Sequence, residues 1–437
     1  MKNKTWKVGF ALLALAATPA FAETEVGQFS LDGMVVPVGC DSCCGDSCCG
    51  DPCCGDPCCG DPCCGDPCCG DACGCGCGVG GGGLLSGIGN GALEGFSLSS
   101  LLGFESLDIG GWTQFGYHDQ LTPLATATND GASFNNVPKN LNLQQQWFYI
   151  GKEADGSNGL GLGFRADFIY GTDAQKTQSF GNKPTTFDND PAWDHGEYGW
   201  AIPQLYGEIA VDDFSVKIGH FFTLVGYEVI GAPGNFFYSH ALTMFNSEPF
   251  THTGVLSTYS GFESLTLYGG WTLGWDTGFD NLNSGNSAIG GFAVNLGDSV
   301  TMTYINTYGN FGMRDGGQDD SYSHSIVFDV SLTDSVNYVF QSDMVGIDPI
   351  ADNGAMVNNN DQFSINQYLF YTYNDIVKFG TRMEWWKSDG TSNYELTSGV
   401  NVKLLGNLIM RPEFRKDWNP STGFDQDMFG CDMILTY

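Results

Sequence analysis

The sequence predicts an all-β membrane protein: a transmembrane antiparallel β-barrel of about 16 strands over residues 105–437, preceded by a disordered or cross-linked Cys-rich N-terminal extension. Short segments of alternating apolar and polar residues fill this region, and they are joined by short and long connections in turn. Beyond the N-terminus, no apolar run approaches the ~20 residues of a transmembrane helix. Because lipid offers no water to unpaired backbone groups, such a chain can span a membrane only by closing its sheet.

The two-residue period is clearest in the segment 159–170. There Leu162 and Phe164 share a face opposite Arg165 and Asp167, as expected for a wall between lipid and a wet lumen. A soluble β-sandwich would alternate in the same way with its apolar faces turned inward. Aromatic residues at strand ends favour the barrel, because they are typical of interfacial girdles; the examples are Trp147, Tyr149, Phe221, Phe222, Trp385 and Trp386.

Sixteen strands are expected, at 107–117, 141–150, 159–170, 202–211, 214–224, 253–259, 263–273, 288–296, 299–307, 322–332, 335–345, 362–373, 375–386, 395–405, 407–416 and 427–437. Short turns belong on the periplasmic side and long loops outside. An even count places both ends of the barrel, and the extension, in the periplasm. The expected long loops are 118–140, 171–201, 225–252, 274–287, 308–321, 346–361, 387–394 and 417–426.

The N-terminus predicts a secretory signal peptide over residues 1–22, with a lysine-rich start, an apolar core at Val8–Ala17 and an A-x-A cleavage triplet at Ala20–Ala22. The rest of the chain divides into an N-terminal segment at 23–39, a Cys-rich pentapeptide repeat at 40–77, a Gly/Ser/Leu-rich linker at 78–104 and the barrel at 105–437.

The composition excludes nucleic acid as a partner, because a formal net charge of −33 repels it. Acidic composition is also typical of disordered chains, but those are poor in aromatic residues, whereas 14% of this chain is aromatic. Acidic loops at the mouths favour cations, although the mixed charges of the wall leave ion preference open.

The repeat at 40–77 holds all but one of the 17 cysteines, in units of D-[S/P]-C-C-G. Asp, Pro and Gly at these places are turn residues, so the tract has no apolar core and needs another source of order. An oxidising compartment favours disulfides or cross-links of the envelope, zinc or copper thiolates are the rival, and disorder is the third reading. The candidate cysteines are Cys43, Cys44, Cys48, Cys49, Cys53, Cys54, Cys58, Cys59, Cys63, Cys64, Cys68 and Cys69.

Several stretches resemble one family, the OmpL-like, second type of outer-membrane β-barrel porins. They are GFRADFIYGTDA (163–174), QLYGEIA (204–210), VKIGHFFTLVGYEV (216–229), NFFYSH (235–240), EPFTHTGVL (248–256), LTLYGGWTLGWDTGF (265–279) and RPEFR (411–415). The resemblance implies a bacterial outer-membrane channel, surrounded by lipid, that passes small hydrophilic solutes or ions by passive diffusion and requires no cofactor. A homotrimer is a further expectation from this resemblance. The cysteine tract departs from the family pattern.

The connection at 225–252 is the third long loop, the one that in general porins often folds into the barrel and narrows the pore. Its aromatic residues suit packing on the inner wall, with carboxylates and imidazoles facing water, where charged side chains set selectivity. The alternative is a loop packed over the mouth. The candidate constriction residues are Glu228, Asn235, Tyr238, His240, Glu248 and His252.

Charged residues on the predicted inner faces are candidates for lining the lumen. Opposed charges would create a transverse field across it, whereas cross-strand ion pairs would only hold the wall together. These residues are Arg165, Asp167, Glu208, Lys217, Lys378, Arg382, Glu384, Lys403, Arg411, Glu413 and Arg415.

The sequence does not predict an enzyme. Ser239 and His240 are neighbours, so in an extended segment they point to opposite faces and make a poor nucleophile–base pair. His240 and His252 lack a defined third metal ligand. The alternative to a porin is a barrel that serves as a membrane anchor for a Cys-rich tract that binds metal or forms disulfide cross-links.

Overall fold

The computed structural model describes residues 97–437, except 104–105, 122–133, 348–350, 353–354 and 357–360. The predicted signal peptide, the segment 23–39, the cysteine repeat and most of the linker lie outside the described residues. The candidate metal or disulfide cysteines therefore stay a prediction.

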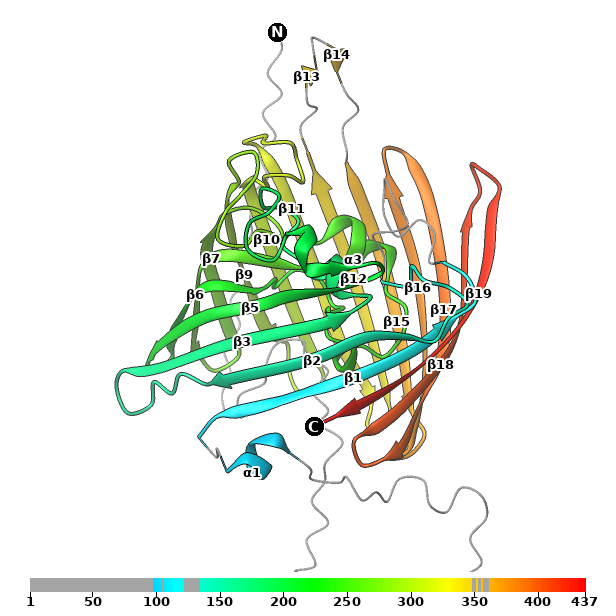
Figure 1. Ribbon diagram of the computed structural model, residues 1–437, viewed down its shortest axis with the longest axis horizontal. Helices are drawn as coiled ribbons and strands as arrows, with labels where there is room; N and C mark the ends of the chain where they lie inside the picture. Colours follow the sequence, from blue (N-terminus) through cyan, green and yellow to red (C-terminus); the bar gives the residue numbers. More distant parts are fainter. Residues whose placement is uncertain (1–96, 104–105, 122–133, 348–350, 353–354, 357–360) are drawn as a thin grey trace, which may run out of the picture.

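Sixteen antiparallel strands close into a barrel, because the first strand, β1, pairs with the last, β19, from Trp112↔Thr436 to His118↔Gly430 (Figure 1). Each predicted segment overlaps one of these strands. The strands are β1 (Asp108–His118), β2 (Asn142–Lys152), β3 (Gly161–Gly171), β5 (Tyr198–Val211), β6 (Phe214–Phe222), β7 (Thr251–Phe262), β8 (Leu265–Thr272), β9 (Asn286–Asn295), β10 (Val300–Asn310), β11 (Ser321–Thr333), β12 (Val336–Gly346), β15 (Gln362–Thr372), β16 (Val377–Ser388), β17 (Thr391–Leu405), β18 (Leu408–Asn419) and β19 (Phe424–Thr436).

The remaining elements are short. Strand β4 (Asp194–His195) pairs with β5, and β13 (Ala351–Asp352) pairs with β14 (Ala355–Met356) in a separate hairpin. The helices are α1 (Leu98–Leu102), α2 (Ala174–Thr177), α3 (Leu242–Ser247) and the 3-10 turns η5 (Pro191–Trp193) and η6 (Ala232–Gly234). Within the described ranges, no helix has both the length and the apolar character to cross a membrane.

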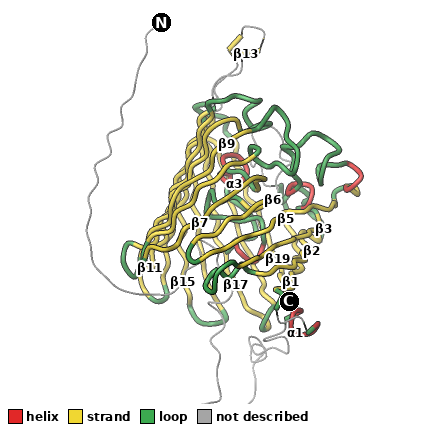
Figure 2. The backbone as a smooth tube through the Cα atoms, turned by 90° about the vertical axis from the view of Figure 1, so that its left-hand side faces the viewer, coloured by secondary structure: helices red, strands yellow, loops and turns green. Residues whose placement is uncertain are grey.

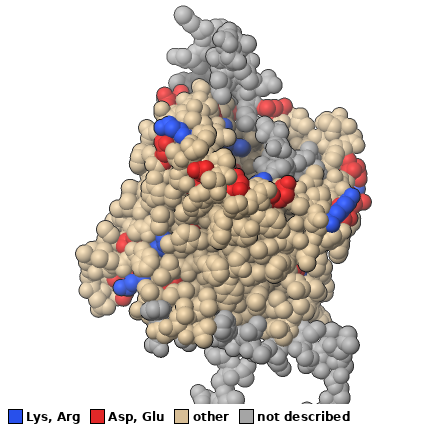
Figure 3. Space-filling model, viewed as in Figure 1, with Lys and Arg blue, Asp and Glu red and all other residues tan. Residues whose placement is uncertain are grey.

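The outer face of the wall is apolar, as the alternation predicts. Phe164 and Met383 are 40% and 49% exposed, whereas Asp167 and Arg382, on the inner face of the same strands, are 1% and 0% exposed. Figure 3 shows a broad band with few charged side chains across the outer wall on the side viewed, and charges gathered toward its upper and lower edges. This band suits contact with lipid tails.

Short turns and long loops lie at opposite ends of the barrel (Figure 2). The turn end also holds α1, where Ser99 bonds to Ile109, and the C-terminus, where Tyr437 pairs with Gly111. Two predicted long loops are wrong. The connection expected at 387–394 is a two-residue hairpin turn of Asp389 and Gly390, with φ of 45° and 83°, the turn that an Asp-Gly pair favours. The other, at 417–426, shrinks to 420–423.

Four aromatic residues expected at the girdles face the interior instead. Trp147, Phe221 and Trp386 are at most 3% exposed, and Tyr149 lies on the same inner face of β2 as Trp147. Residues at i and i+1 of a strand point to opposite faces, so Trp386 faces inward while its neighbour Trp385 faces outward. Trp147 and Tyr149, at i and i+2, share one face, and that face is the inner one. The rings of Trp147, Phe221 and Trp386 are covered by a loop that folds inside the barrel.

Candidate functional site

The inserted loop, residues 223–250, leaves β6 at Phe222, runs through the interior with η6 and α3, and returns at Thr251. In Figure 1, α3 lies within the ring of strands. The prediction that this loop folds inward therefore agrees with its position. Its apolar residues pack on opposite sides of the barrel: Phe236 and Phe237 lie in a cluster with Phe370 of β15, and Met244 lies in one with Trp147 of β2.

Glycines on the inner wall make room for the aromatic residues of the inserted loop. A Cβ atom added at Gly380 of β16 would overlap the Phe236 ring, and one at Gly430 of β19 would lie 2.9 Å from Cδ1 of Tyr238. A Cβ atom at Gly116 of β1 would lie 2.5 Å from the Tyr238 hydroxyl oxygen. Since real Cβ atoms do not approach so closely, these glycines are a condition of the docking.

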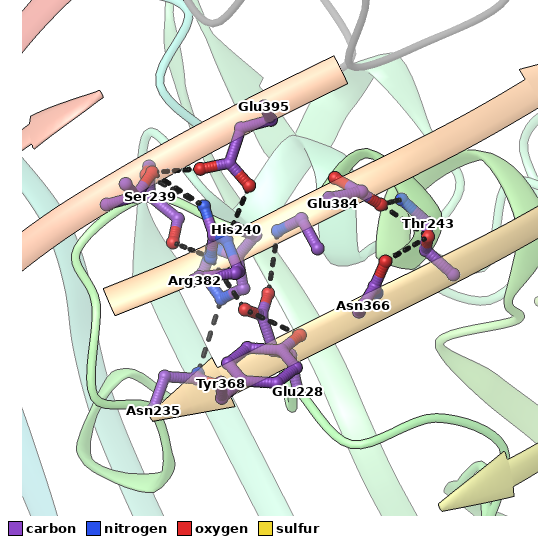
Figure 4. A network of polar contacts seen from close by, with 12 residues as sticks. Glu228, Asn235, Ser239, His240, Thr243, Asn366, Tyr368, Arg382, Glu384 and Glu395 are labelled. Atoms are coloured by element: carbon purple, nitrogen blue, oxygen red, sulfur yellow. Dashed lines mark hydrogen bonds and ion pairs between the residues drawn. The ribbon is translucent and has the colours of Figure 1, made fainter. Parts of the chain in front are cut away.

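Arg382 of β16 is the centre of the polar contacts that hold the inserted loop (Figure 4). Its Nη1 donates to Oε1 of Glu228 at 2.6 Å and to the Ser239 carbonyl at 2.9 Å, both within the loop. Its Nε donates to Oε2 of Glu395 on β17 at 2.8 Å. The guanidinium is fully buried and also lies over the Phe237 ring, 5.1 Å from the centroid. A single wall residue thus ties loop side chain, loop backbone and neighbouring strand together.

Two arginines of β18 bind further loop carbonyls. Arg411 donates to the carbonyls of Ala232 and Asn235, at 2.9 and 2.5 Å, and Arg415 donates to that of His240 at 2.5 Å. Each arginine is also paired with a wall carboxylate: Arg411 with Asp432, and Arg415 with Asp417.

Wall carboxylates accept the loop's backbone N–H groups. Glu413 accepts from Tyr238 and Ser239, at 2.8 and 3.1 Å. Glu384 accepts from Leu242 and Thr243, at 2.6 and 2.7 Å, as Figure 4 shows for Thr243. These two N–H groups open α3, whose N-cap residue has no side chain that could bond to them, so a carboxylate from β16 supplies the cap.

The remaining candidate residues of the inserted loop bond locally. Asn235 accepts from the Val229 N–H at 3.0 Å and donates to its carbonyl at 2.6 Å. His240 Nε2 lies 3.2 Å from the same carbonyl, and burial lowers the pKa of His240 to about 4, so its imidazole is neutral. His252, at the start of β7, contacts other partners, the Gly274 carbonyl at 3.1 Å and Oγ1 of Thr223 at 3.1 Å.

The two glutamates of the inserted loop lie in opposite environments. Burial tends to raise the pKa of Glu228, but the charge of Arg382 and the hydrogen bond from the Ala241 N–H outweigh it and hold that pKa below its usual value. Burial and the neighbouring Asp343 of β12 raise the pKa of Glu248 well above its usual value. Glu248 and Asp343 each accept from Nε2 of Gln341, both at 2.6 Å. One end of the loop is thus held by a salt bridge and the other by two carboxyls around one amide.

The other predicted lumen residues lie on inner faces away from the loop's polar contacts. Arg165 bridges Asp167 at 2.5 Å and Asp108 at 3.0 Å. Glu208 and Lys217 are opposite one another in the register of β5 and β6 and are half-buried. Lys378 and Lys403 continue the inner faces of β16 and β17.

Among the polar wall residues of this network that sequence analysis missed are Glu395, Gln341 and Asp417. Glu395 was the first residue of a predicted strand and Asp417 the first of a predicted loop. The alternation that places both side chains on the inner face was therefore not recognised. Gln341 is uncharged and follows the inner face of β12, as Val339 and Asp343 do. Among the described residues, no group of three or more His, Cys, Asp or Glu side chains is placed to hold a metal ion.

A closed sixteen-strand barrel with its third long loop folded inside is the architecture of an outer-membrane porin. Residues 106–436 match the family described as beta-barrel porin-2, OmpL-like, and the chain belongs to this family. It is therefore a porin of the bacterial outer membrane, a channel for passive diffusion.

Solved structures with the same fold include the outer membrane channel DcaP of Acinetobacter baumannii and an anion-selective porin from Comamonas acidovorans. The DcaP channel has a TM-score of 0.51 and 9% identity, over 76% of this chain and 97% of that one. The Comamonas porin has a TM-score of 0.51 and 9% identity, over 76% and 99%. At such identities the likeness shows the fold alone. No curated protein sequence matches the chain.

Proposed function

We propose that the inserted loop is the constriction of this porin, and that small hydrophilic solutes or ions diffuse past it. The observation that carries this proposal is the set of hydrogen bonds between wall side chains and the backbone of the loop. Wall carboxylates and guanidiniums bind consecutive peptide groups from Tyr238 to Thr243, deep inside the barrel. A loop held in this way keeps one shape while solute passes, as a size filter requires.

The test is a recording of the purified full-length protein in planar bilayers. Stepwise, ohmic conductance is expected, with a unit step that grows when the loop is shortened by deletion of Asn235–Tyr238. A protein that inserts but never conducts would remove the proposal and favour a barrel that serves as an anchor. A unit step that the deletion leaves unchanged would place the constriction elsewhere.

We propose that Ser239 and His240 have no catalytic role. The Ser239 hydroxyl lies 3.3 Å from Nη2 of Arg382, and His240 turns its Nε2 to Val229 and Asn235. Neither side chain is aimed at the other in a way that would activate a nucleophile. Assay of the protein with ester and amide substrates is expected to give no turnover beyond that of the S239A variant.

The N-terminal tract is proposed to lie in the periplasm, because both ends of the described barrel are on the short-turn side. Disulfide or envelope cross-linking, with zinc or copper binding as the rival, is the proposed chemistry of its cysteines. Thiol titration with metal analysis of the oxidised and reduced protein separates the two. A homotrimer is proposed from the family resemblance, and cross-linking of the protein in native outer membranes tests it.

A further inference from the structure

Four inner-face side chains form an unbroken row of phenol rings and cations across adjacent strands. The row consists of Tyr149 (β2), Arg165 (β3), Tyr206 (β5) and Lys217 (β6), and we call it the tyrosine–cation row. Cζ of Arg165 lies 3.7 Å from the Tyr149 ring centroid, and Nζ of Lys217 lies 5.0 Å from that of Tyr206. Arg165 and Tyr206 are opposite one another in the register of β3 and β5.

The row lies on the wet side of the wall, between the inserted loop and the periplasmic end. The neighbouring outward residues Phe164, Leu205 and Ile218 are 40%, 39% and 52% exposed, so the row faces inward. Trp147, the next inner residue of β2 toward the loop, is completely buried beneath it, whereas Tyr149 is only half-buried. The row therefore begins where the cover of the loop ends.

The two cations of the row differ in how they are bound. Arg165 donates to Asp167 and Asp108, and Gly151 opposite it leaves space for its stem, since a Cβ there would lie 3.1 Å from Cδ of Arg165. Lys217 makes no ion pair with any residue in the described part of the chain. Its ammonium, half-buried above a phenol ring, keeps donors for a ligand.

We propose that the tyrosine–cation row binds ring-bearing monoanions as they pass below the inserted loop. The ring of the solute packs against the exposed part of Tyr206, which is half-buried, and its carboxylate pairs with the Lys217 ammonium. The class includes aromatic carboxylates and sugar acids, which share a flat or puckered ring and one negative charge. This inference rests on the proposed function, because only a conducting barrel delivers solutes to the row.

The experiment uses the full-length protein in planar bilayers and four probes: benzoate, glucuronate, acetate and benzyl alcohol. Benzoate or glucuronate is expected to reduce the open-channel current at concentrations at least about tenfold lower than acetate, which lacks the ring, and benzyl alcohol, which lacks the charge. Block by benzoate alone assigns the row to aromatic carboxylates, and block by both extends it to sugar acids.

The variants K217M and Y206L are expected to weaken this block by about tenfold, while Y206F, which keeps the ring, retains it. The matched control is K416M, which removes an exposed amine at the far end of the barrel. Equal block by acetate and benzoate, or block that K217M leaves unchanged, overturns the row and leaves the proposed function standing.

A protein that does not conduct overturns the proposed function. Saturation-transfer NMR of benzoate with the detergent-solubilised protein then decides the row separately. Binding that K217M removes supports it, and no binding to the wild-type protein ends it.

Discussion

Two parts of the inner wall differ in whether basic side chains bind the inserted loop. The basic wall, strands β16–β18, carries three buried inward guanidiniums, Arg382, Arg411 and Arg415, and all three bind the inserted loop. The hydroxyl wall, strands β7–β12, contains no lysine or arginine at all. Its inner face is built mainly from small hydroxyl and apolar residues, with Asp329 and Asp343 as its acidic members.

Residues of the hydroxyl wall satisfy one another across strands. Thr272 and Ser287 bond at 2.9 Å, and Thr307 and Ser323 bond at 2.7 Å. By contrast, the inserted loop has no regular secondary structure from Tyr238 to Ala241, and α3 begins only at Leu242. The backbone N–H and C=O groups of this segment therefore lack the partners that a helix or sheet would supply. Buried peptide groups need hydrogen-bond partners, and the charged side chains of the basic wall supply them to this irregular segment. The comparison teaches that the buried guanidiniums of strands β16–β18 lie where a loop is held.

The largest effect is expected from R382M, which removes the centre of the basic wall's grip. Glu228 and Glu395 would be left buried without their partner, and loss of one member of a buried ion pair costs about 3–5 kcal/mol. We expect a lower free energy of unfolding in urea, followed by tryptophan fluorescence, and noisier single-channel currents. R382K keeps the charge but loses the planar guanidinium, so its free energy of unfolding is expected to lie between those of the wild type and R382M. Wild-type stability of R382M would mean that the loop is held by packing alone.

The second-largest effect is expected at Gly380 of the same wall, whose missing side chain leaves the space that the Phe236 ring fills. A methyl group at Gly380 meets the Phe236 ring, so G380A is expected to cost about 1–3 kcal/mol, the usual cost of overpacking. Gly269 of β8 is the matched control, because a Cβ there meets no atom within 4 Å. Urea unfolding of both variants should separate them clearly. Equal stability would show that the inserted loop yields at Phe236 without cost.

The contrast between local and distant information explains what the sequence could and could not predict. The face of Arg382 or Phe164 follows from a two-residue period that any short window reveals. The hydrogen-bond partners of the charged inner residues do not follow from a short window. Leu242 and Glu384 are 142 positions apart, and Tyr238 and Glu413 are 175 apart. The tight turn at Asp389 was missed because the residues from Thr391 to Tyr394 were read as loop, although they lie in the extended β17.

A smaller effect is expected on the hydroxyl wall. T307V removes the hydroxyl that bonds to Ser323 and accepts from Nε1 of Trp275 at 3.2 Å. Each bond is between neutral groups, so the cost should be about 1 kcal/mol, well below that of R382M. T307S keeps the hydroxyl and serves as the control in the same unfolding assay. A T307V cost equal to that of R382M would erase the distinction between the two walls.

The smallest effect at acidic pH, and the most specific, concerns the point where the inserted loop touches the hydroxyl wall. Glu248 meets Gln341 and Asp343 of β12 there, and burial followed by repulsion from Asp343 raises the pKa of Glu248 above its usual 4.5. As pH rises from 4.5, the unfolded chain releases a proton that the folded loop keeps, so this group lowers stability with rising pH until Glu248 itself ionises.

E248Q keeps an acceptor for the Gln341 amide and does not titrate. It is therefore expected to change the free energy of unfolding by less than about 1 kcal/mol below pH ~4.5, where Glu248 is protonated in both the folded and the unfolded chain. Above that pH the fall in stability is flattened, so E248Q is expected to become more stable than the wild type as pH rises. E228Q is the control with the opposite sign, because Arg382 overcomes burial and lowers the pKa of Glu228, so its stabilising charge is lost only as pH falls below 4.5. Unfolding free energies measured across this pH range decide the matter: an alkaline slope that survives in E248Q would show that the loop meets the hydroxyl wall through packing, with no proton involved.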